Sequence, residues 1–146
     1  MDSRGLGASV LVVDDERESS DVVRHWLEGQ GYRVTTAASG AEALRFLGRE
    51  VPALVLSDVF MPAMNGFELC AAIRRSHRHE ELPILLMSGH ETDRAKGFRA
   101  GASEVLRKPL DRDELSVRVR VLTLLRELRS DAELARAELE KWKDDV

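Results

Sequence analysis

Short runs of β-branched and other apolar residues alternate along this chain with segments whose apolar residues have helical spacing. Such alternation is typical of a parallel sheet flanked by helices. The expected strands cover residues 9–13, 32–37, 53–57, 83–87 and 103–106, and a helical segment follows each one. We therefore predict an α/β fold with a doubly wound, five-stranded parallel sheet and an extended C-terminal helix.

Polar side chains follow four of these predicted strands. Asp14 and Asp15 follow the first strand, Asp58 the third, Ser88 the fourth and Lys108 the fifth. In an open parallel sheet the carboxyl ends of the strands share one edge, and ligands bind there where the strand order reverses. We expect these five side chains to lie together at that edge.

Three carboxylates at one edge repel one another strongly unless a cation lies among them. Oxygen ligands favour Mg²⁺, which keeps several waters and leaves room for phosphate oxygens, and Mn²⁺ is an expected substitute. Phosphoryl transfer requires an aligned nucleophile and neutralisation of charge on the phosphoryl oxygens. Asp58 can be the nucleophile, while Mg²⁺, the Lys108 ammonium and the Ser88 hydroxyl can each contact one phosphoryl oxygen.

Four motifs stand in order on the alternating strands: Val12-Val13-Asp14-Asp15-Glu16; Asp58 followed by Met61-Pro62 and Asn65-Gly66; Met87-Ser88-Gly89; and Lys108-Pro109. With these motifs the chain resembles, over about residues 10–125, the receiver domain of bacterial two-component response regulators. The resemblance implies the flavodoxin-like strand order 2-1-3-4-5. It also implies that Asp58 accepts a phosphoryl group from the phosphohistidine of a sensor histidine kinase or phosphotransfer protein. The chain would then be a phosphoacceptor, not an enzyme, with at most autodephosphorylation.

The same resemblance implies roles for individual residues. The metal would be bound by Asp15, Asp58 and the backbone carbonyl of Phe60, with Asp14 acting through water. The Lys108–Pro109 peptide bond is expected to be cis, as in relatives, which would direct the lysine inward.

One position departs from the pattern of the family, and two others bear on the lifetime of the phosphorylated state. Where relatives carry an aromatic switch residue on the last strand, this chain has Val105, whose χ1 is stiff and whose reach is short. Our hypothesis is that the 88–90 loop and the fourth helix report the phosphorylated state instead, coupled to the final helix. The resemblance also implies that Phe60 and His90 flank the path of the hydrolytic water. Because Phe60 is bulky and apolar, we expect a long-lived phosphorylated state. Alternatively, Phe60 only caps the core and His90 is a solvated loop residue.

The C-terminal segment contains neither glycine nor proline from Asp111 onward. About 33 residues of helix would extend roughly 50 Å, beyond a small domain. Apolar or small residues recur at helical spacing with one irregularity: Val117, Val121, Leu124, Leu128, Ala132, Ala135, Leu139 and Trp142. We predict a receiver domain over 8–126 and a helical extension over 127–146. The extension would be a coiled coil, giving a parallel homodimer through residues 117–142, or a linker to an output domain. Alternatively, it is a charged single helix stabilised by intrahelical ion pairs.

Composition narrows the possible functions. The net charge of −4 argues against direct nucleic-acid binding, and no apolar run approaches the ~20 residues of a membrane span. Cys70 is the single cysteine, so the chain can form no internal disulfide and suits a reducing, cytoplasmic environment. Two rival functions remain open. One is a receiver-like scaffold or dimerisation module without phosphorylation. The other is an aspartate-nucleophile phosphohydrolase, which would need an Asp-x-Asp pair where this chain has Asp14-Asp15.

Overall fold

The computed structural model describes residues 7–144 and contains a five-stranded parallel sheet in the order β2-β1-β3-β4-β5. The strands are β1 (Ser9–Val13), β2 (Arg33–Ala37), β3 (Leu54–Asp58), β4 (Ile84–Ser88) and β5 (Glu104–Arg107). The predicted fold class is confirmed, including the strand order that the family resemblance implied. β1 and β3 are neighbours, so the order reverses between them, and the crevice at their carboxyl ends is where such a sheet binds ligands.

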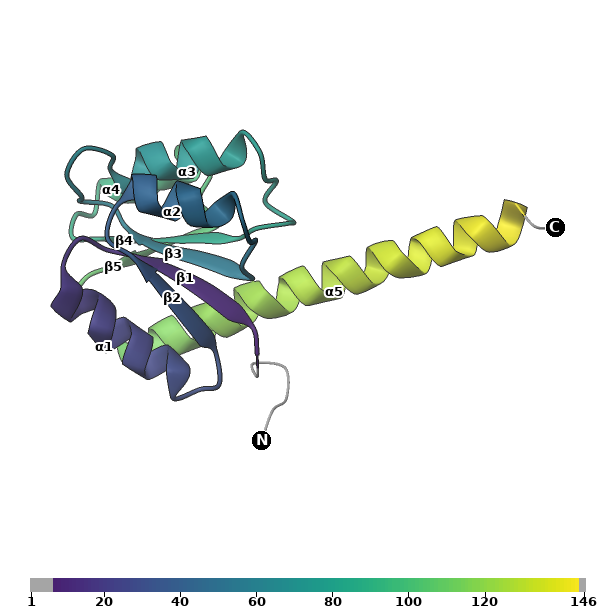
Figure 1. Cartoon of the computed structure of the whole chain (residues 1–146), viewed down its shortest axis with the longest axis horizontal. Helices are drawn as coiled ribbons and strands as arrows, with labels where there is room; N and C mark the ends of the chain where they lie inside the picture. Colours follow the sequence, from purple (N-terminus) through teal and green to yellow (C-terminus); the bar gives the residue numbers. More distant parts are fainter. Residues whose placement is uncertain (1–6, 145–146) are drawn as a thin grey trace.

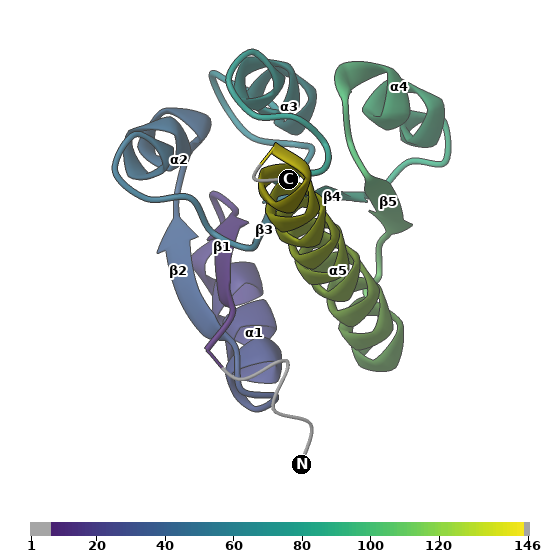
Figure 2. The ribbon, with the colours of Figure 1, turned by 90° about the vertical axis from the view of Figure 1, so that its right-hand side faces the viewer.

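Helices cover both faces of the sheet. They are α1 (Arg17–Glu28), α2 (Gly40–Leu47), α3 (Gly66–Arg74), α4 (Asp93–Ala100) and α5 (Arg112–Asp144). α1 and α5 lie on one face and α2, α3 and α4 on the other (Figures 1 and 2). Each face has its own apolar core, one around Leu11, Val55 and Leu86 and the other around Val12, Leu56 and Leu85. Every residue of β3 and β4 is buried, as continuous apolar strands between two helical layers require.

Strands β3, β4 and β5 each begin and end one residue later than predicted. Asp58 and Ser88 are therefore the last residues of their strands, where Asp58 pairs with Met87 and Ser88 with Arg107. Backbone pairing does not depend on side-chain polarity, so the ladder continues through the first polar residue. The shift anchors the Asp58 and Ser88 backbones in the sheet rather than in loops.

The buried face of α1 is narrow. Val23 and Leu27 are buried and Trp26 is half-buried, but Val22 is 47% exposed. The buried face runs instead through Ser20, Val23 and Leu27, spaced three and four residues apart. Because successive helical residues are 100° apart, a helix that packs along this line turns Val22 toward solvent.

Arg74 at the end of α3 ties three parts of the chain together. Its guanidinium donates to the backbone carbonyls of Gly101 and Leu82, both at 2.7 Å. Gly101 ends α4 with a left-handed backbone (φ 112°), which glycine adopts without strain. Arg74 therefore fixes the C-terminal end of α4 to α3 and to the loop before β4.

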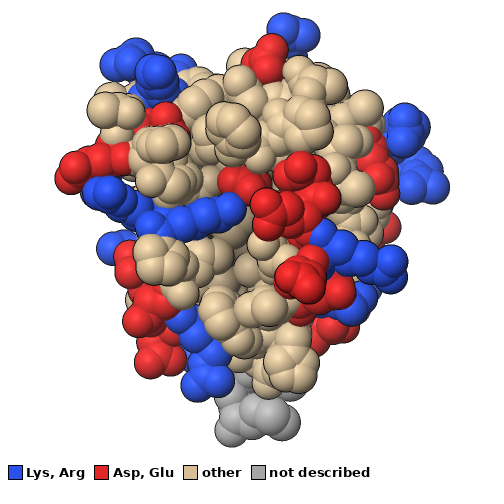
Figure 3. Space-filling model, turned by 90° about the vertical axis from the view of Figure 1, so that its left-hand side faces the viewer, with Lys and Arg blue, Asp and Glu red and all other residues tan. Residues whose placement is uncertain are grey.

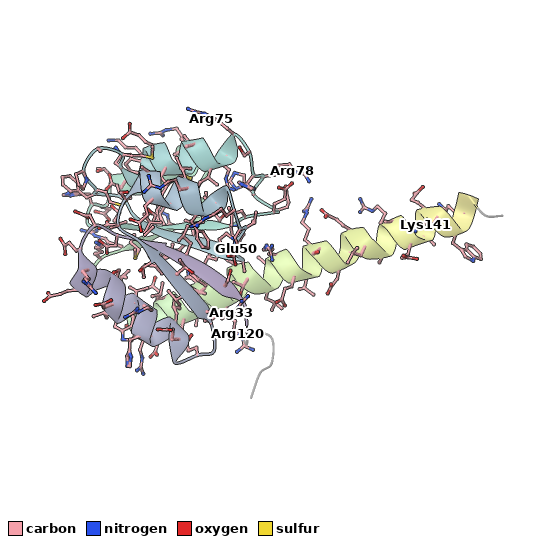
Figure 4. All side chains as sticks on the ribbon, in the orientation of Figure 1. Arg33, Glu50, Arg75, Arg78, Arg120 and Lys141 are labelled. Carbon is pink, nitrogen blue, oxygen red and sulfur yellow. The ribbon has the colours of Figure 1, made fainter. Side chains whose placement is uncertain are left out.

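α5 packs on the sheet through its first half only. Leu115 and Val119 are fully buried, whereas Leu134, Leu139 and Trp142 are more than half exposed. The helix continues without interruption beyond the domain, and Lys141 lies on its projecting half (Figure 4). Within residues 7–144, no helix has the length and apolarity needed to cross a membrane.

Candidate functional site

Three carboxylates meet where β1 and β3 end. One oxygen of each of Asp14, Asp15 and Asp58 lies within 4.8 Å of the others. Asp14 and Asp58 are buried at 4% and 6% exposure, while Asp15 is exposed and leaves the cluster open to solvent. Figure 3 views the molecule from this side, and acidic side chains gather near the middle of the face. The oxygen-rich, partly open set matches the ligands that a hard divalent cation prefers.

The environment of Asp14 shows how crowded the negative charge is. Burial raises the pKa of this carboxyl above its ordinary value, and the Asp58 and Asp15 carboxylates raise it further. The Glu16 backbone N–H, which donates to Asp14 Oδ1 at 2.9 Å, and the Lys108 ammonium act in the opposite direction. A divalent cation at the cluster would remove the net repulsion, so the three side chains fit a metal such as Mg²⁺.

Asp58 is held from two sides. The Lys108 ammonium donates to Asp58 Oδ2 at 2.9 Å, and the Phe60 backbone N–H donates weakly to Oδ1 at 3.3 Å. The Lys108–Pro109 peptide bond is cis, and the Lys108 N–H donates to the Ser88 carbonyl at 2.7 Å. The lysine thus crosses from the end of β5 to the end of β3 with its ammonium at the acidic cluster.

The loop after Asp58 is fixed by the start of α3. The Gly66 N–H donates to the Val59 carbonyl at 2.8 Å, and Asn65 and Glu68 form a reciprocal capping box. A Cβ at position 66 would lie 2.5 Å from the Asp58 carbonyl oxygen and 2.8 Å from Val59 Cα. Only glycine permits this approach, so the Asn65-Gly66 motif positions the backbone of Asp58 itself.

The Ser88 hydroxyl lies at the same edge, with partners that the sequence did not indicate. Its oxygen accepts from the His90 N–H at 3.0 Å and lies 2.5 Å from Asp93 Oδ2. Asp93 is the first residue of α4 and is 9% exposed. An acidic residue in the first turn of a helix is ordinary, since it complements the dipole, so no sequence signal marked Asp93.

The remaining predicted positions lie around this edge. Phe60 is 83% exposed and His90 is exposed, whereas Val105 on β5 is 8% exposed. Val105 packs against α4, where a Cβ on Gly97 would lie 2.6 Å from Val105 Cγ2. The side chain of Phe60 therefore does not cap the core, and position 105 has little room for a larger side chain.

The sheet order, the acidic cluster and the lysine bonded to Asp58 together define an α/β domain whose acidic cluster lies at the switch point of its sheet. The family model for the response regulator receiver domain matches residues 10–120. The chain belongs to the response regulator receiver domain family of two-component systems.

Named relatives agree with this family. The chain is 36% identical over 141 residues to response regulator Rre1 of Synechocystis sp., an alignment that covers 94% of this chain and 61% of that protein. It is also 36% identical over 120 residues to response regulator PleD of Caulobacter vibrioides, covering 81% of this chain and 26% of that protein. The chain thus corresponds to only part of these two regulators.

Solved structures show the same fold. The chemotaxis protein CheY4 of Vibrio cholerae superposes with a TM-score of 0.74 at 34% identity, covering 80% of this chain and 98% of that one. NtrX from Brucella abortus superposes with a TM-score of 0.80 at 28% identity, covering 88% of this chain and 29% of that one.

Proposed function

We propose that this receiver domain accepts a phosphoryl group on Asp58 from the phosphohistidine of a sensor histidine kinase or phosphotransfer protein. The observation that carries the proposal is the placement of Asp58. Its Oδ2 is bonded to the Lys108 ammonium at 2.9 Å, and an oxygen of Asp58 lies within 4.8 Å of oxygens of Asp14 and Asp15. Negative charge that a phosphoryl group brings to Asp58 would be neutralised by the Lys108 ammonium on one side and by a cation at the acidic cluster on the other.

The chain's own residues supply the rest of the reaction. A carboxylate oxygen of Asp58 attacks the phosphorus in line with the donor nitrogen. A new P–O bond forms as the P–N bond breaks, and the imidazole nitrogen keeps the bonding electron pair. Lys108 contacts one phosphoryl oxygen and the Ser88 hydroxyl donates to another, so both residues stabilise charge that develops during transfer.

Asp15, Asp58 and the Phe60 backbone carbonyl would hold a Mg²⁺ ion, with Asp14 acting through water and Mn²⁺ able to replace Mg²⁺. When bound, the ion neutralises charge on the carboxylates and on the phosphoryl group. Asp14 supports this assignment, because its buried carboxyl has a raised pKa and gains a compensating charge when a cation binds.

Exposed Phe60 and His90 would control access of water to the phosphorylated Asp58. Phe60 is large, apolar and 83% exposed at the loop that leaves Asp58, so it can shield the acyl phosphate from attack. We expect slow loss of the phosphoryl group from the purified protein. Replacing Phe60 with asparagine, with Val22→Asn as a surface control, should speed this loss if the shielding is real.

The proposed partners follow from the family and the long helix. We propose that the protein acts in the cytoplasm, that residues 8–126 form the receiver and that 127–146 form an extension. This extension would be a coiled coil or a linker toward an output domain.

Exposed Val117, Val121 and Leu128 lie along α5, and a second copy in parallel would cover them together with Leu139 and Trp142. Light scattering of the full chain and of a chain ending at residue 126 would test the dimer, which requires that only the former be dimeric.

The central test is incubation with Mg²⁺ and acetyl phosphate followed by intact mass measurement. We expect one added phosphoryl group on the wild type and none on Asp58→Asn, which keeps the shape of the side chain. A Glu50→Gln variant should be phosphorylated normally, because Glu50 (labelled in Figure 4) is an exposed acid before the start of β3, whereas Asp58 lies at the other end of that strand. Absence of phosphorylation by acetyl phosphate and by a panel of kinases would leave only the scaffold function.

A further inference from the structure

The hydroxyl of Ser88 is already engaged. It has two potential acceptors, Asp93 Oδ2 at 2.5 Å and the His90 carbonyl oxygen at 3.1 Å. A hydroxyl has one proton to donate, and a carboxylate accepts more strongly than a neutral carbonyl. The Ser88 proton is therefore assigned to Asp93.

Asp93 has an unusual position for an acidic residue that begins a helix. Such residues commonly remain solvated while they stabilise the positive end of the dipole. Asp93 is instead 9% exposed, and its carboxylate is directed back to the end of β4. A buried carboxylate needs a hydrogen-bond donor, and the side-chain donor that the structure gives Asp93 is Ser88.

We infer that Asp93 is a positioning residue that competes with the phosphoryl group for the Ser88 hydroxyl. The inference rests on the proposed phosphorylation of Asp58. One proton cannot serve both acceptors, so donation to a phosphoryl oxygen breaks the Ser88–Asp93 hydrogen bond. The buried Asp93 carboxylate then lacks its donor and must reach water, which requires the first turn of α4 to move outward.

The packing of α4 confines this movement to its N-terminal turn. A Cβ on Gly97, in the middle of the helix, would lie 2.6 Å from Val105 Cγ2 and 3.4 Å from Leu86 Cδ1, so only glycine lets the helix backbone approach the sheet this closely. The C-terminal end is fixed because Arg74 donates to the Gly101 carbonyl at 2.7 Å. The N-terminal end is held by the Ser88–Asp93 bond and by the Asp93 N–H, which donates to the His90 carbonyl at 3.2 Å. Gly97 would thus be the pivot, and a large side chain at position 105 is not needed for the response.

The test is a beryllofluoride titration of the full chain in Mg²⁺, with the bound fraction measured by ¹H–¹⁵N NMR. Asp93→Ala should bind this phosphoryl mimic more tightly, by on the order of tenfold, because no hydrogen bond to Asp93 has to be broken. In a Ser88→Ala background the same substitution should change affinity less than twofold. Asp93→Asn, which keeps the shape of the side chain, should tighten binding in the same direction but less.

Glu91→Ala is the matched control, because it removes one negative charge two residues before Asp93. Glu91 is exposed and pairs with Arg107 at 3.5 Å. Tightening by Glu91→Ala equal to that by Asp93→Ala would show a general charge effect and overturn the inference. Equal effects of Asp93→Ala with and without Ser88, or no tightening by either Asp93 variant, would also overturn it. Failure of the wild type to bind the mimic would instead refute the proposed function, and the inference with it.

Discussion

Replacing Asp14 with asparagine should stabilise the metal-free protein, because the acidic cluster is a local source of instability. Carboxylate oxygens of Asp14, Asp15 and Asp58 lie within 4.8 Å of one another. Two unit charges at that separation repel by about 3.5 kcal/mol at an effective dielectric constant near 20, and by about 1 kcal/mol in water. Buried Asp58 approaches the first value and exposed Asp15 the second.

Two favourable interactions reduce this repulsion. The Lys108 ammonium attracts Asp14, and the Glu16 N–H donates to Asp14 Oδ1 at 2.9 Å. Asparagine keeps an oxygen that can accept from Glu16, so the substitution removes mainly the charge. Allowing for the lost attraction to Lys108, we expect Asp14→Asn to raise the free energy of unfolding by about 1–2 kcal/mol at pH 7 without metal. For a chain of this length that corresponds to a melting temperature higher by roughly 2–8 °C.

The assay is urea unfolding in EDTA and again in Mg²⁺. Saturating Mg²⁺ at a hundred times its dissociation constant stabilises a binding protein by about 2.7 kcal/mol. The wild type should gain free energy of unfolding of this order and Asp14→Asn much less. In Mg²⁺ the stability advantage of Asp14→Asn should therefore shrink or reverse. Glu18→Gln makes an equal charge change at an exposed position of α1. It should change the free energy of unfolding by less than about 0.5 kcal/mol in EDTA and in Mg²⁺.

The pH dependence has a defined sign. Burial and then the neighbouring carboxylates raise the pKa of Asp14 above the ordinary 3.8, against the opposing Glu16 N–H and Lys108. The folded protein therefore binds this proton more tightly than the unfolded chain, and the associated stability is lost as pH rises through the raised pKa. The advantage of Asp14→Asn should grow from acidic to neutral pH. An Asp14→Asn protein that is less stable than wild type in EDTA at pH 7 would refute the electrostatic reasoning.

Three further predictions concern the frame of the site. Gly66→Ala should lower the free energy of unfolding by about 1–3 kcal/mol and reduce phosphorylation, because its Cβ would lie 2.5 Å from the Asp58 carbonyl oxygen. Gly89→Ala, where a Cβ meets nothing within 4 Å, is the urea-unfolding control, and equal effects would contradict the argument. Cys70 should resist alkylation at pH 8 until urea unfolds the protein, because burial raises its pKa to about 11, and rapid labelling of folded protein would oppose this. Arg74→Lys should cost about 1–3 kcal/mol in urea unfolding, since an ammonium cannot replace the guanidinium fork, and an unchanged midpoint would exclude that role.

The sheet and most of the site could be predicted because both depend on patterns that are local in sequence. An apolar run followed by a polar residue marks a buried strand and its carboxyl end, which placed Asp14, Asp58 and Lys108 at one edge. Strand limits were off by one residue because backbone pairing continues through Asp58 and Ser88. The order of the strands came from the resemblance to a family, since periodicity does not specify which strands are neighbours.

The contacts of individual side chains could not be predicted from the sequence. Val22 and Val23 have the same chemistry, and only the direction from which the sheet approaches α1 decides that Val22 is exposed. Asp93 has an ordinary role at a helix terminus unless the path of the 89–92 loop is known. Gly97 likewise carries no sign that Val105 will occupy the space beside it.

The same contacts bear on how a signal would leave the domain. α5 meets the other face of the sheet, through Leu115 and Val119, and is linked to β5 by a partly exposed ion pair between Arg118 and Glu104 at 3.8 Å. Such a pair contributes little energy, because solvent screens it. With Arg74 fixing the C-terminal end of α4, outward movement of the first turn of α4 would leave the position of α5 almost unchanged. This differs from our hypothesis from the sequence, in which the fourth helix is coupled to the final helix. A helix-mediated dimer would then persist in both states, and phosphorylation would alter the surface around the start of α4 that a partner contacts.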